Sequence, residues 1–189
     1  PTYGNANETL AGRASVFTQN GSTYSLSSEL TAGPVDQANL YGYRIAQDGD
    51  LLAVAMPGSQ RGSNFGLGAV AVYTRNPGGP WTFDQMLFPY SNVTTTSDGG
   101  GWGVHLAVHE YKDAQGHDIG AVVAVGDYAD DNIDADGNGS NAASIITNAG
   151  TVSLFGRDSG PGGTWTAGYK LWAGGRTGTG GAAGGGATA

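Results

Sequence analysis

The sequence predicts an all-β protein made of two and a half copies of a four-stranded antiparallel sheet. Short runs rich in β-branched and aromatic residues alternate with Gly, Pro, Asn and Asp, which is typical of strands joined by hairpin turns. Glycine occurs 35 times and charged residues make up only 13% of the chain, which suits many tight turns. The strand pattern also repeats along the chain, and no helical periodicity accompanies it.

One complete copy of the repeating unit runs from Tyr41 to Pro89. Its four expected strands are Tyr43–Ala46, Leu51–Ala55, Gly68–Tyr73 and Trp81–Phe88. The first two strands are joined at Asp48–Asp50, where Asp followed by Gly favours a simple hairpin turn. Because Leu51–Ala55 has no alternating polar residue, we expect this strand to be buried on both faces. A sheet with such a strand needs neighbours to cover it.

Parts of the same unit occur before and after this copy. Aromatic residues begin the fourth strand of each copy, and intervals of 57 and 84 residues separate Tyr24, Trp81 and Trp165. The longer interval reflects loop insertions, which cost little conformational entropy. We expect these aromatic side chains to pack between neighbouring sheets. Other matching segments are Gly68–Tyr73 with those beginning at Gly12 and Gly150, Tyr41-Gly42 with Trp102-Gly103, and Leu51–Ala55 with Ala121–Val125.

The repeats divide the chain into four parts. Residues 1–32 form half a unit, with strands expected at Gly12–Gln19 and Thr23–Thr31. Residues 33–89 form the complete unit, and residues 90–173 form a second complete unit with long loop insertions. Residues 174–189 are a tail rich in Gly, Ala and Thr. Such a composition is normally a flexible linker. We nevertheless expect that something holds this tail in place, and in an assembly it could pack along a neighbouring chain.

These residues resemble the FG-GAP repeat, the blade of integrin-type β-propellers. The Phe-Gly start of that repeat is similar to Tyr41-Gly42 and Trp102-Gly103, and its central Asp-Leu-Leu-Ala-Val-Gly-Ala-Pro segment is similar to Asp50–Pro57. The last unit departs from the pattern, since it has Val125–Tyr128 where the Gly-Ala-Pro end of this segment is expected. The resemblance covers residues 10 to 173, and it implies propeller-type blades in an extracellular adhesion or cell-surface protein.

The number of blades bears on function. Propellers close with at least ~4 blades, so a chain with two and a half leaves exposed sheet edges that recruit other strands. We expect either a piece of a longer propeller or copies that complete one another, with the half-unit hairpin joining a neighbouring chain. The predicted function is an extracellular structural or adhesive protein that assembles into a filament or larger surface object. The alternative is a binding module whose long loops in the last unit recognise a glycan or a protein with the help of calcium.

Charge and composition argue against several other classes. The formal net charge of −8 disfavours binding to nucleic acids and anionic membranes. No apolar run is long enough to be inserted in a membrane. The chain contains no cysteine for a thiol nucleophile and no Gly-x-Ser-x-Gly motif, so we do not expect an enzyme.

An acidic loop in the last unit is the best candidate for a metal site. Asn132, Asp134, Asp136 and Ser140 occupy positions 1, 3, 5 and 9 of a calcium-binding loop, and Gly137 provides its turn. Ala143 replaces the usual bidentate glutamate at position 12. The predicted calcium ligands are Asp130, Asn132, Asp134, Asp136, Asn138 and Ser140. The loop follows the second strand, whereas integrin-type calcium loops precede it, so the alternative of a solvated acidic loop stays open.

Two further patterns concern surface chemistry. Asn-x-Ser/Thr sequons, which are potential glycosylation sites, begin at Asn7, Asn20, Asn92 and Asn138. Asn20 and Asn92 lie on expected surface turns and are the best acceptors, although such tripeptides also arise by chance in a chain rich in Asn, Ser and Thr.

Three histidines lie in the last unit. His105 and His109 are four residues apart and would share one face of a strand, and His117 could join them across a hairpin to bind zinc. The alternative is that all three are ordinary surface residues, because His105 matches the strand position of Arg44.

Overall fold

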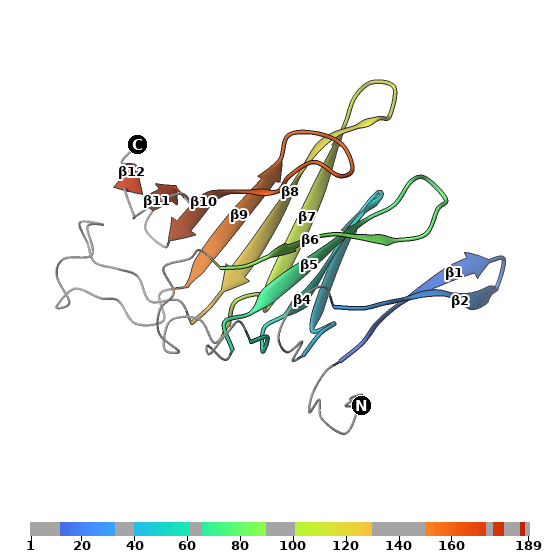
Figure 1. Ribbon diagram of the computed structural model, residues 1–189, viewed down its shortest axis with the longest axis horizontal. Helices are drawn as coiled ribbons and strands as arrows, with labels where there is room; N and C mark the ends of the chain where they lie inside the picture. Colours follow the sequence, from blue (N-terminus) through green and yellow to red (C-terminus); the bar gives the residue numbers. More distant parts are fainter. Residues whose placement is uncertain are drawn as a thin grey trace.

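A computed structural model of the protein describes residues 12–32, 40–60, 66–89, 101–129, 150–172, 176–179 and 186–187. Within these ranges the chain is all-β, and its strands form three antiparallel sheets (Figure 1). The prediction of an all-β, antiparallel fold is therefore confirmed. Because the described ranges contain no helix, none of them provides a helical membrane span.

The sheets follow chain order, and each strand pairs with the next one in the sequence. The first two strands form the hairpin sheet, the next four the middle sheet, and the remaining six the C-terminal sheet. Their bounds are β1 Ala14–Asn20, β2 Thr23–Leu30, β3 Arg44–Asp48, β4 Leu51–Met56, β5 Ala69–Thr74, β6 Thr82–Leu87, β7 His105–Lys112, β8 Asp118–Asp127, β9 Thr151–Arg157, β10 Thr166–Trp172, β11 Arg176–Thr179 and β12 Gly186–Ala187.

Local turn chemistry explains why the strands pair in this order. Gly21 follows Asn20 in the β1–β2 turn with a φ of 61°, and Gly49 follows Asp48 in the β3–β4 turn with a φ of 56°. Glycine adopts this left-handed conformation without steric cost, so both segments make the tight hairpins that the sequence predicts.

Two apolar cores join the three sheets in chain order. The middle and C-terminal sheets face each other, whereas the hairpin sheet meets the middle sheet through its base at Ala14 and Leu30. One core joins the hairpin sheet to one face of the middle sheet, and the other joins the opposite face of the middle sheet to the C-terminal sheet. In Figure 1 the sheets follow one another across the molecule from β1 to β12. Every residue of β4 is buried, which confirms that this strand is covered on both sides.

Alternation along β4 assigns its side chains to the two cores. Leu51, Ala53 and Ala55 pack towards the C-terminal sheet, whereas Leu52, Val54 and Met56 pack towards the hairpin sheet. Full burial of a valine or leucine side chain stabilises the folded state by roughly 1.5–3 kcal/mol. The middle sheet is therefore the central layer of the fold.

The structure corrects one of the sequence matches by a single residue. Arg44 pairs with Ala55 in the middle sheet, and the equivalent His105 pairs with Gly126 in the C-terminal sheet. Ala55 is therefore equivalent to Gly126, and Leu51 is equivalent to Val122 rather than to Ala121. A shift of one residue moves every side chain to the opposite face of a sheet. Apolar composition alone cannot reveal this shift, because every residue of 121–125 is Ala or Val.

The glycine-rich tail continues the C-terminal sheet. β11 pairs with β10, and β12 pairs with β11, both in antiparallel orientation. Paired strands hold these segments, as we expected for the tail, and the strand that receives them belongs to the same chain.

The aromatic residues that mark the repeat are buried where a preceding sheet covers them. Trp81 and Trp165 are buried in the two cores, and so are Tyr41 and Trp102. The prediction that these residues are structural is confirmed. Tyr24 is the exception, because it lies on the open face of the hairpin sheet and is 67% exposed.

Candidate functional site

The predicted calcium ligands cannot be located in the structure. Asp130, Asn132, Asp134, Asp136, Asn138 and Ser140 all lie outside the described residues, so calcium binding stays a prediction. The strands on either side of this loop are adjacent, since Asp127 at the end of β8 pairs with Thr151 at the start of β9. Within the part of the chain that the structure describes, no group of three or more His, Asp or Glu side chains could hold a metal ion.

The three histidines do not form a common site. The Nδ1 atom of His109 lies 2.9 Å from an Asp48 carboxylate oxygen, and that of His117 lies 3.0 Å from Asp113. His105 lines a pocket at the other end of β7. Each histidine thus has its own surroundings, as the alternative to a zinc site predicts.

One of the four predicted glycosylation sites is described. Asn20 ends β1 and is exposed, and its carbonyl oxygen accepts a hydrogen bond from Thr23 Oγ1 at 2.8 Å. Asn7, Asn92 and Asn138 lie outside the described residues. The exposed position of Asn20 is compatible with modification.

A charged cluster joins the β3–β4 turn to β7. Asp48 accepts a hydrogen bond from the backbone N–H of Glu110 at 3.0 Å, and the Glu110 carboxylate lies 3.1 Å from Lys112 Nζ. The backbone hydrogen bond, followed by the contact with His109, lowers the pKa of the Asp48 carboxyl group. The Glu110 carboxylate raises the pKa of Lys112. Nothing in the sequence indicates this cluster, because Asp48 and Glu110 lie 62 residues apart.

A buried arginine connects β6 to the C-terminal sheet. The Arg157 guanidinium contacts the Asp118 carboxylate, lies 3.5 Å from that of Asp84, and stacks 5.2 Å from the ring centre of Trp165. Arg75 repeats the arrangement in the middle sheet, with Nε 2.8 Å from Asp50 and the guanidinium 4.5 Å from the Trp81 ring. Since Arg75 and Arg157 occupy matching positions of the repeat, these contacts are structural.

Hydroxyl groups connect the hairpin and middle sheets. Tyr41 Oη lies 2.6 Å from Tyr73 Oη, and Tyr73 donates a hydrogen bond to the Thr31 carbonyl oxygen. Burial is the main cause that raises the pKa of both phenols, so both stay protonated hydrogen-bond donors at neutral pH.

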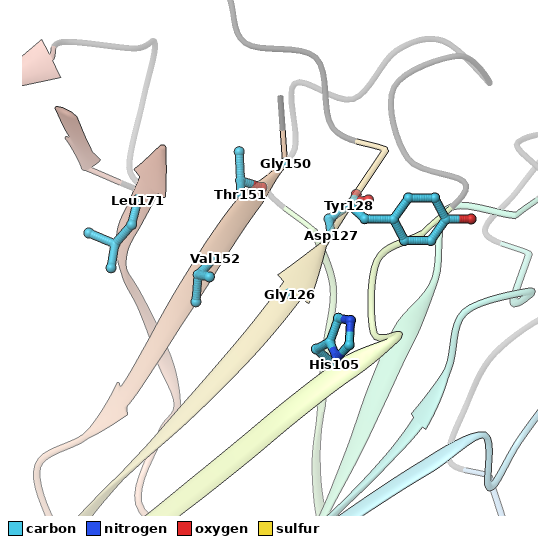
Figure 2. Close-up of a pocket in the computed structure, with 8 residues that line it drawn as sticks. All are labelled: His105, Gly126, Asp127, Tyr128, Gly150, Thr151, Val152 and Leu171. Atoms are coloured by element: carbon cyan, nitrogen blue, oxygen red, sulfur yellow. The ribbon is translucent and has the colours of Figure 1, made fainter. Parts of the chain in front are cut away.

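The remaining feature is a pocket of about 460 Å³ on the face of the C-terminal sheet that points away from the middle sheet. Figure 2 shows His105, Val152 and Leu171 around it on three different strands, with Tyr128 beyond the end of β8. Its other lining residues are Gly126, Asp127, Gly150 and Thr151. The surface of the lining is mainly apolar. Such a surface suits an apolar side chain.

A comparison of the chain with known protein families and with curated proteins found no match in either.

Proposed function

We propose that this protein is a structural component of an extracellular or cell-surface assembly, in which propeller-type sheets of several copies stack head to tail. One observation carries the proposal. The hairpin sheet and the C-terminal sheet each have an exposed face, and the residues on these faces occupy repeat positions that are buried in the middle sheet. Exposed apolar side chains gathered on one face are typical of a surface that binds another protein.

The open face of the hairpin sheet repeats positions that are buried in the middle sheet. Phe17 is 58% exposed, whereas its equivalent Tyr73 is 2% exposed; Tyr24 is 67% exposed, whereas its equivalent Trp81 is 9% exposed. Tyr73 and Trp81 belong to the core that the middle sheet shares with Ala14 and Leu30 of the hairpin sheet. By the same reasoning, Phe17 and Tyr24 present a surface suited to a preceding sheet.

The open face of the C-terminal sheet repeats the positions of the middle sheet that face a following sheet. Val152 and Leu171 pair with each other, and so do their equivalents Val70 and Leu87. Val152 is 37% exposed and Leu171 is 36% exposed, whereas Val70 and Leu87 are buried to 0% and 2%. The open face of the C-terminal sheet therefore suits a following sheet.

These two faces belong to opposite sides of the repeating unit, so one copy can supply what another lacks. An interface between two different faces is heterologous, and it yields a closed ring or an open filament. The resemblance to surface-protein repeats and the exposed sequon at Asn20 support an extracellular location. A piece of a longer propeller is the alternative, in which further sheets of the same chain cover both faces.

The proposal is tested with one charge on each open face. Phe17→Glu charges the hairpin face and Val152→Glu charges the C-terminal face, while both chains retain their internal cores. Each variant alone should be monomeric in size-exclusion chromatography with light scattering, because each has lost one half of the interface. An equimolar mixture should form dimers and nothing larger, since only the two unmodified faces can meet.

The wild-type chain should form larger rings or filaments, visible by electron microscopy. Ile119→Glu serves as the matched control, because Ile119 is exposed on the C-terminal sheet but does not line the pocket. A wild-type chain that stays folded and monomeric at high concentration would contradict self-assembly. Dimers formed by either variant alone would contradict the head-to-tail arrangement.

A further inference from the structure

The pocket on the C-terminal sheet has a filled counterpart on the middle sheet. Strand pairing matches the two sites residue by residue, because Asp127 pairs with Thr151 as Met56 pairs with Ala69, and Leu171 pairs with Val152 as Leu87 pairs with Val70. The residues equivalent to the pocket lining are Arg44, Ala55, Met56, Pro57, Gly68, Ala69, Val70 and Leu87. We call this counterpart the middle socket.

The middle socket is filled by the segment that leads into β7. Trp102 is buried in the same core as Ala55, Val70 and Leu87. A Cβ atom on Gly68 would lie 2.4 Å from the Trp102 carbonyl oxygen, and one on Gly103 would lie 3.3 Å from the Ala55 Cβ. The backbone of Trp102-Gly103 is therefore pressed directly onto the middle sheet.

The same contact occurs once more, between the middle sheet and the hairpin sheet. A Cβ atom on Gly12 would lie 2.0 Å from the Tyr41 carbonyl oxygen, and one on Gly42 would lie 2.4 Å from the Arg13 carbonyl oxygen. Gly12 and Gly68 have φ values of 70° and 79°, and the equivalent Gly150 in the pocket has a φ of 74°. Gly150 has the same backbone conformation, but within the described residues no other sheet approaches it. The atom closest to its Cβ position is the Asp127 carbonyl oxygen of its own sheet, at 3.4 Å.

We propose that this pocket is a socket for an aromatic side chain followed by glycine, and that Tyr3-Gly4 of a second copy of the chain fills it. The socket presupposes the head-to-tail association proposed above and supplies a specific contact within it. An aromatic ring in a desolvated pocket is the kind of anchor that dominates binding energy at interfaces.

The sequence indicates which segment is the occupant. Aromatic-glycine pairs occur at residues 3–4, 41–42, 65–66, 102–103 and 155–156. Two of these pairs fill the contacts described above, Phe155 is buried within β9, and the pair at 65–66 leads directly into β5 of the middle sheet. Tyr3-Gly4 precedes the hairpin sheet, which is the sheet that would lie against the pocket.

The spacing within the second copy is sufficient for this contact. In the middle sheet the first and third strands run parallel and lie two strand spacings apart, which is about 10 Å. Gly12 lies eight positions after Gly4, and an extended chain over eight positions reaches roughly 26 Å. Tyr3-Gly4 can therefore reach the socket while β1 and β2 pack on the open face.

One lining residue differs in a way that can be measured. Arg44 Nε donates a hydrogen bond to the Val104 carbonyl oxygen at 3.0 Å, two residues after Trp102. His105 stands at the equivalent place in the pocket. An arginine in place of His105 would be a longer and permanently charged hydrogen-bond donor, so it should strengthen binding of Tyr3-Gly4 to the pocket.

The first experiment measures binding of fluorescent peptides to the full chain carrying Tyr3→Ala, whose own N-terminus no longer competes. The probe is a peptide of residues 1–8, and fluorescence anisotropy reports its Kd. We expect the peptide with Tyr3→Ala to bind about 30-fold more weakly, as for loss of an aromatic anchor. His105→Arg in the protein should tighten binding about fivefold, the gain of one hydrogen bond. Val152→Glu should abolish binding, and the control Ile119→Glu should leave it unchanged.

A second peptide, residues 100–106, carries Trp102-Gly103 and should bind the same site and displace the first. Equal binding of the wild-type and Tyr3→Ala peptides would overturn the socket, and so would binding that survives Val152→Glu.

The second experiment compares assembly of the wild-type chain with that of the chain carrying Tyr3→Ala. If the chain carrying Tyr3→Ala needs a protein concentration about 30-fold higher than the wild type to assemble, the result supports the socket. Assembly that is unchanged overturns the socket while leaving head-to-tail stacking intact. A wild-type chain that never assembles, although the peptide of residues 100–106 binds, contradicts self-association and overturns the second copy as the occupant.

Discussion

At the scale of single residues, the contacts between sheets depend on glycines that admit a neighbouring backbone. Gly12 and Gly68 each face the carbonyl oxygen of an aromatic residue at a distance that no Cβ atom could occupy. The sequence shows that glycine recurs at these positions, but it does not show that the reason is an approach between different sheets. A recurring glycine before a strand could equally have been a simple turn residue.

We expect Gly68→Ala to destabilise the protein more than Gly78→Ala. Both glycines have similar φ values, 79° and 74°, so both substitutions carry a left-handed strain of about 1–2 kcal/mol. A Cβ atom on Gly78 meets open space, whereas one on Gly68 meets the Trp102 backbone. This overpacking should add roughly 1–3 kcal/mol to the loss of unfolding free energy. Urea denaturation measures both variants, and equal losses would show that the contact between sheets is not tight.

The charged cluster at the β3–β4 turn should make stability depend on pH. Because the pKa of Asp48 is lowered in the folded state, its ionised carboxylate stabilises the fold above the unfolded pKa of about 4. That contribution is lost as the pH falls through the lowered pKa. Asp48→Ala should therefore reduce Tm at pH 7, and it should reduce Tm less near pH 2.

The control for this prediction is Gln47→Ala, an exposed and uncharged neighbour in β3. Its effect on Tm should be the same at both pH values. The contribution of Lys112 to stability depends on pH in the opposite direction, because its pKa is raised in the folded state. This contribution is complete at neutral pH and is lost only as the pH rises through the pKa of the folded state. An Asp48→Ala effect on Tm that is as large at pH 2 as at pH 7 would rule out the ionic origin.

At the scale of strands, equivalent elements differ in burial because of their position in the stack. β2 and β6 each have an aromatic residue at their start, because Tyr24 is the second residue of β2 and Trp81 directly precedes β6. Yet Tyr24 is exposed and Trp81 is buried. The strands themselves could be predicted from the sequence, because apolar runs bounded by turn residues specify them locally. Burial depends on which sheet lies alongside, and that is not a local property.

Trp81→Ala and Tyr24→Ala provide a matched comparison of these positions. Trp81 fills the core between two sheets, so its removal should lower the unfolding free energy by about 3–5 kcal/mol. Tyr24→Ala should change it by no more than about 0.5 kcal/mol in the monomer. Denaturation at low protein concentration, followed by circular dichroism, checks both values. A large loss for Tyr24→Ala in a monomer would mean that its open face is covered from within the chain.

Two features of the elements could not be predicted from the sequence. The match of Ala121–Val125 to Leu51–Ala55 was off by one residue, because consecutive Ala and Val residues fit either alignment. The pocket was not foreseen either, since it is formed by the ends of β7, β8, β9 and β10 together. A comparison of Gly12, Gly68 and Gly150 was the available signal. Tyr41-Gly42 and Trp102-Gly103 follow the strand pairs that begin after Gly12 and Gly68, whereas the aromatic-glycine pair after Gly150, Phe155-Gly156, lies within β9.

At the scale of the whole molecule, the two-strand, four-strand and six-strand sheets form an open stack with unequal ends. The sequence indicated this organisation through the spacing of Tyr24, Trp81 and Trp165, because repetition reports architecture even where single elements are ambiguous. The tail strands β11 and β12 were harder to predict, since Gly, Ala and Thr carry little strand preference.

The middle sheet has a consequence for how such a chain can grow. Its two faces are complementary. The middle sheet packs against the C-terminal sheet through the same repeat positions by which the hairpin sheet packs against the middle sheet. Duplication of residues 40–89 within the gene would therefore insert a further layer whose contacts on both sides already exist. The length of the molecule could change during evolution in whole layers, without any new interface having to arise.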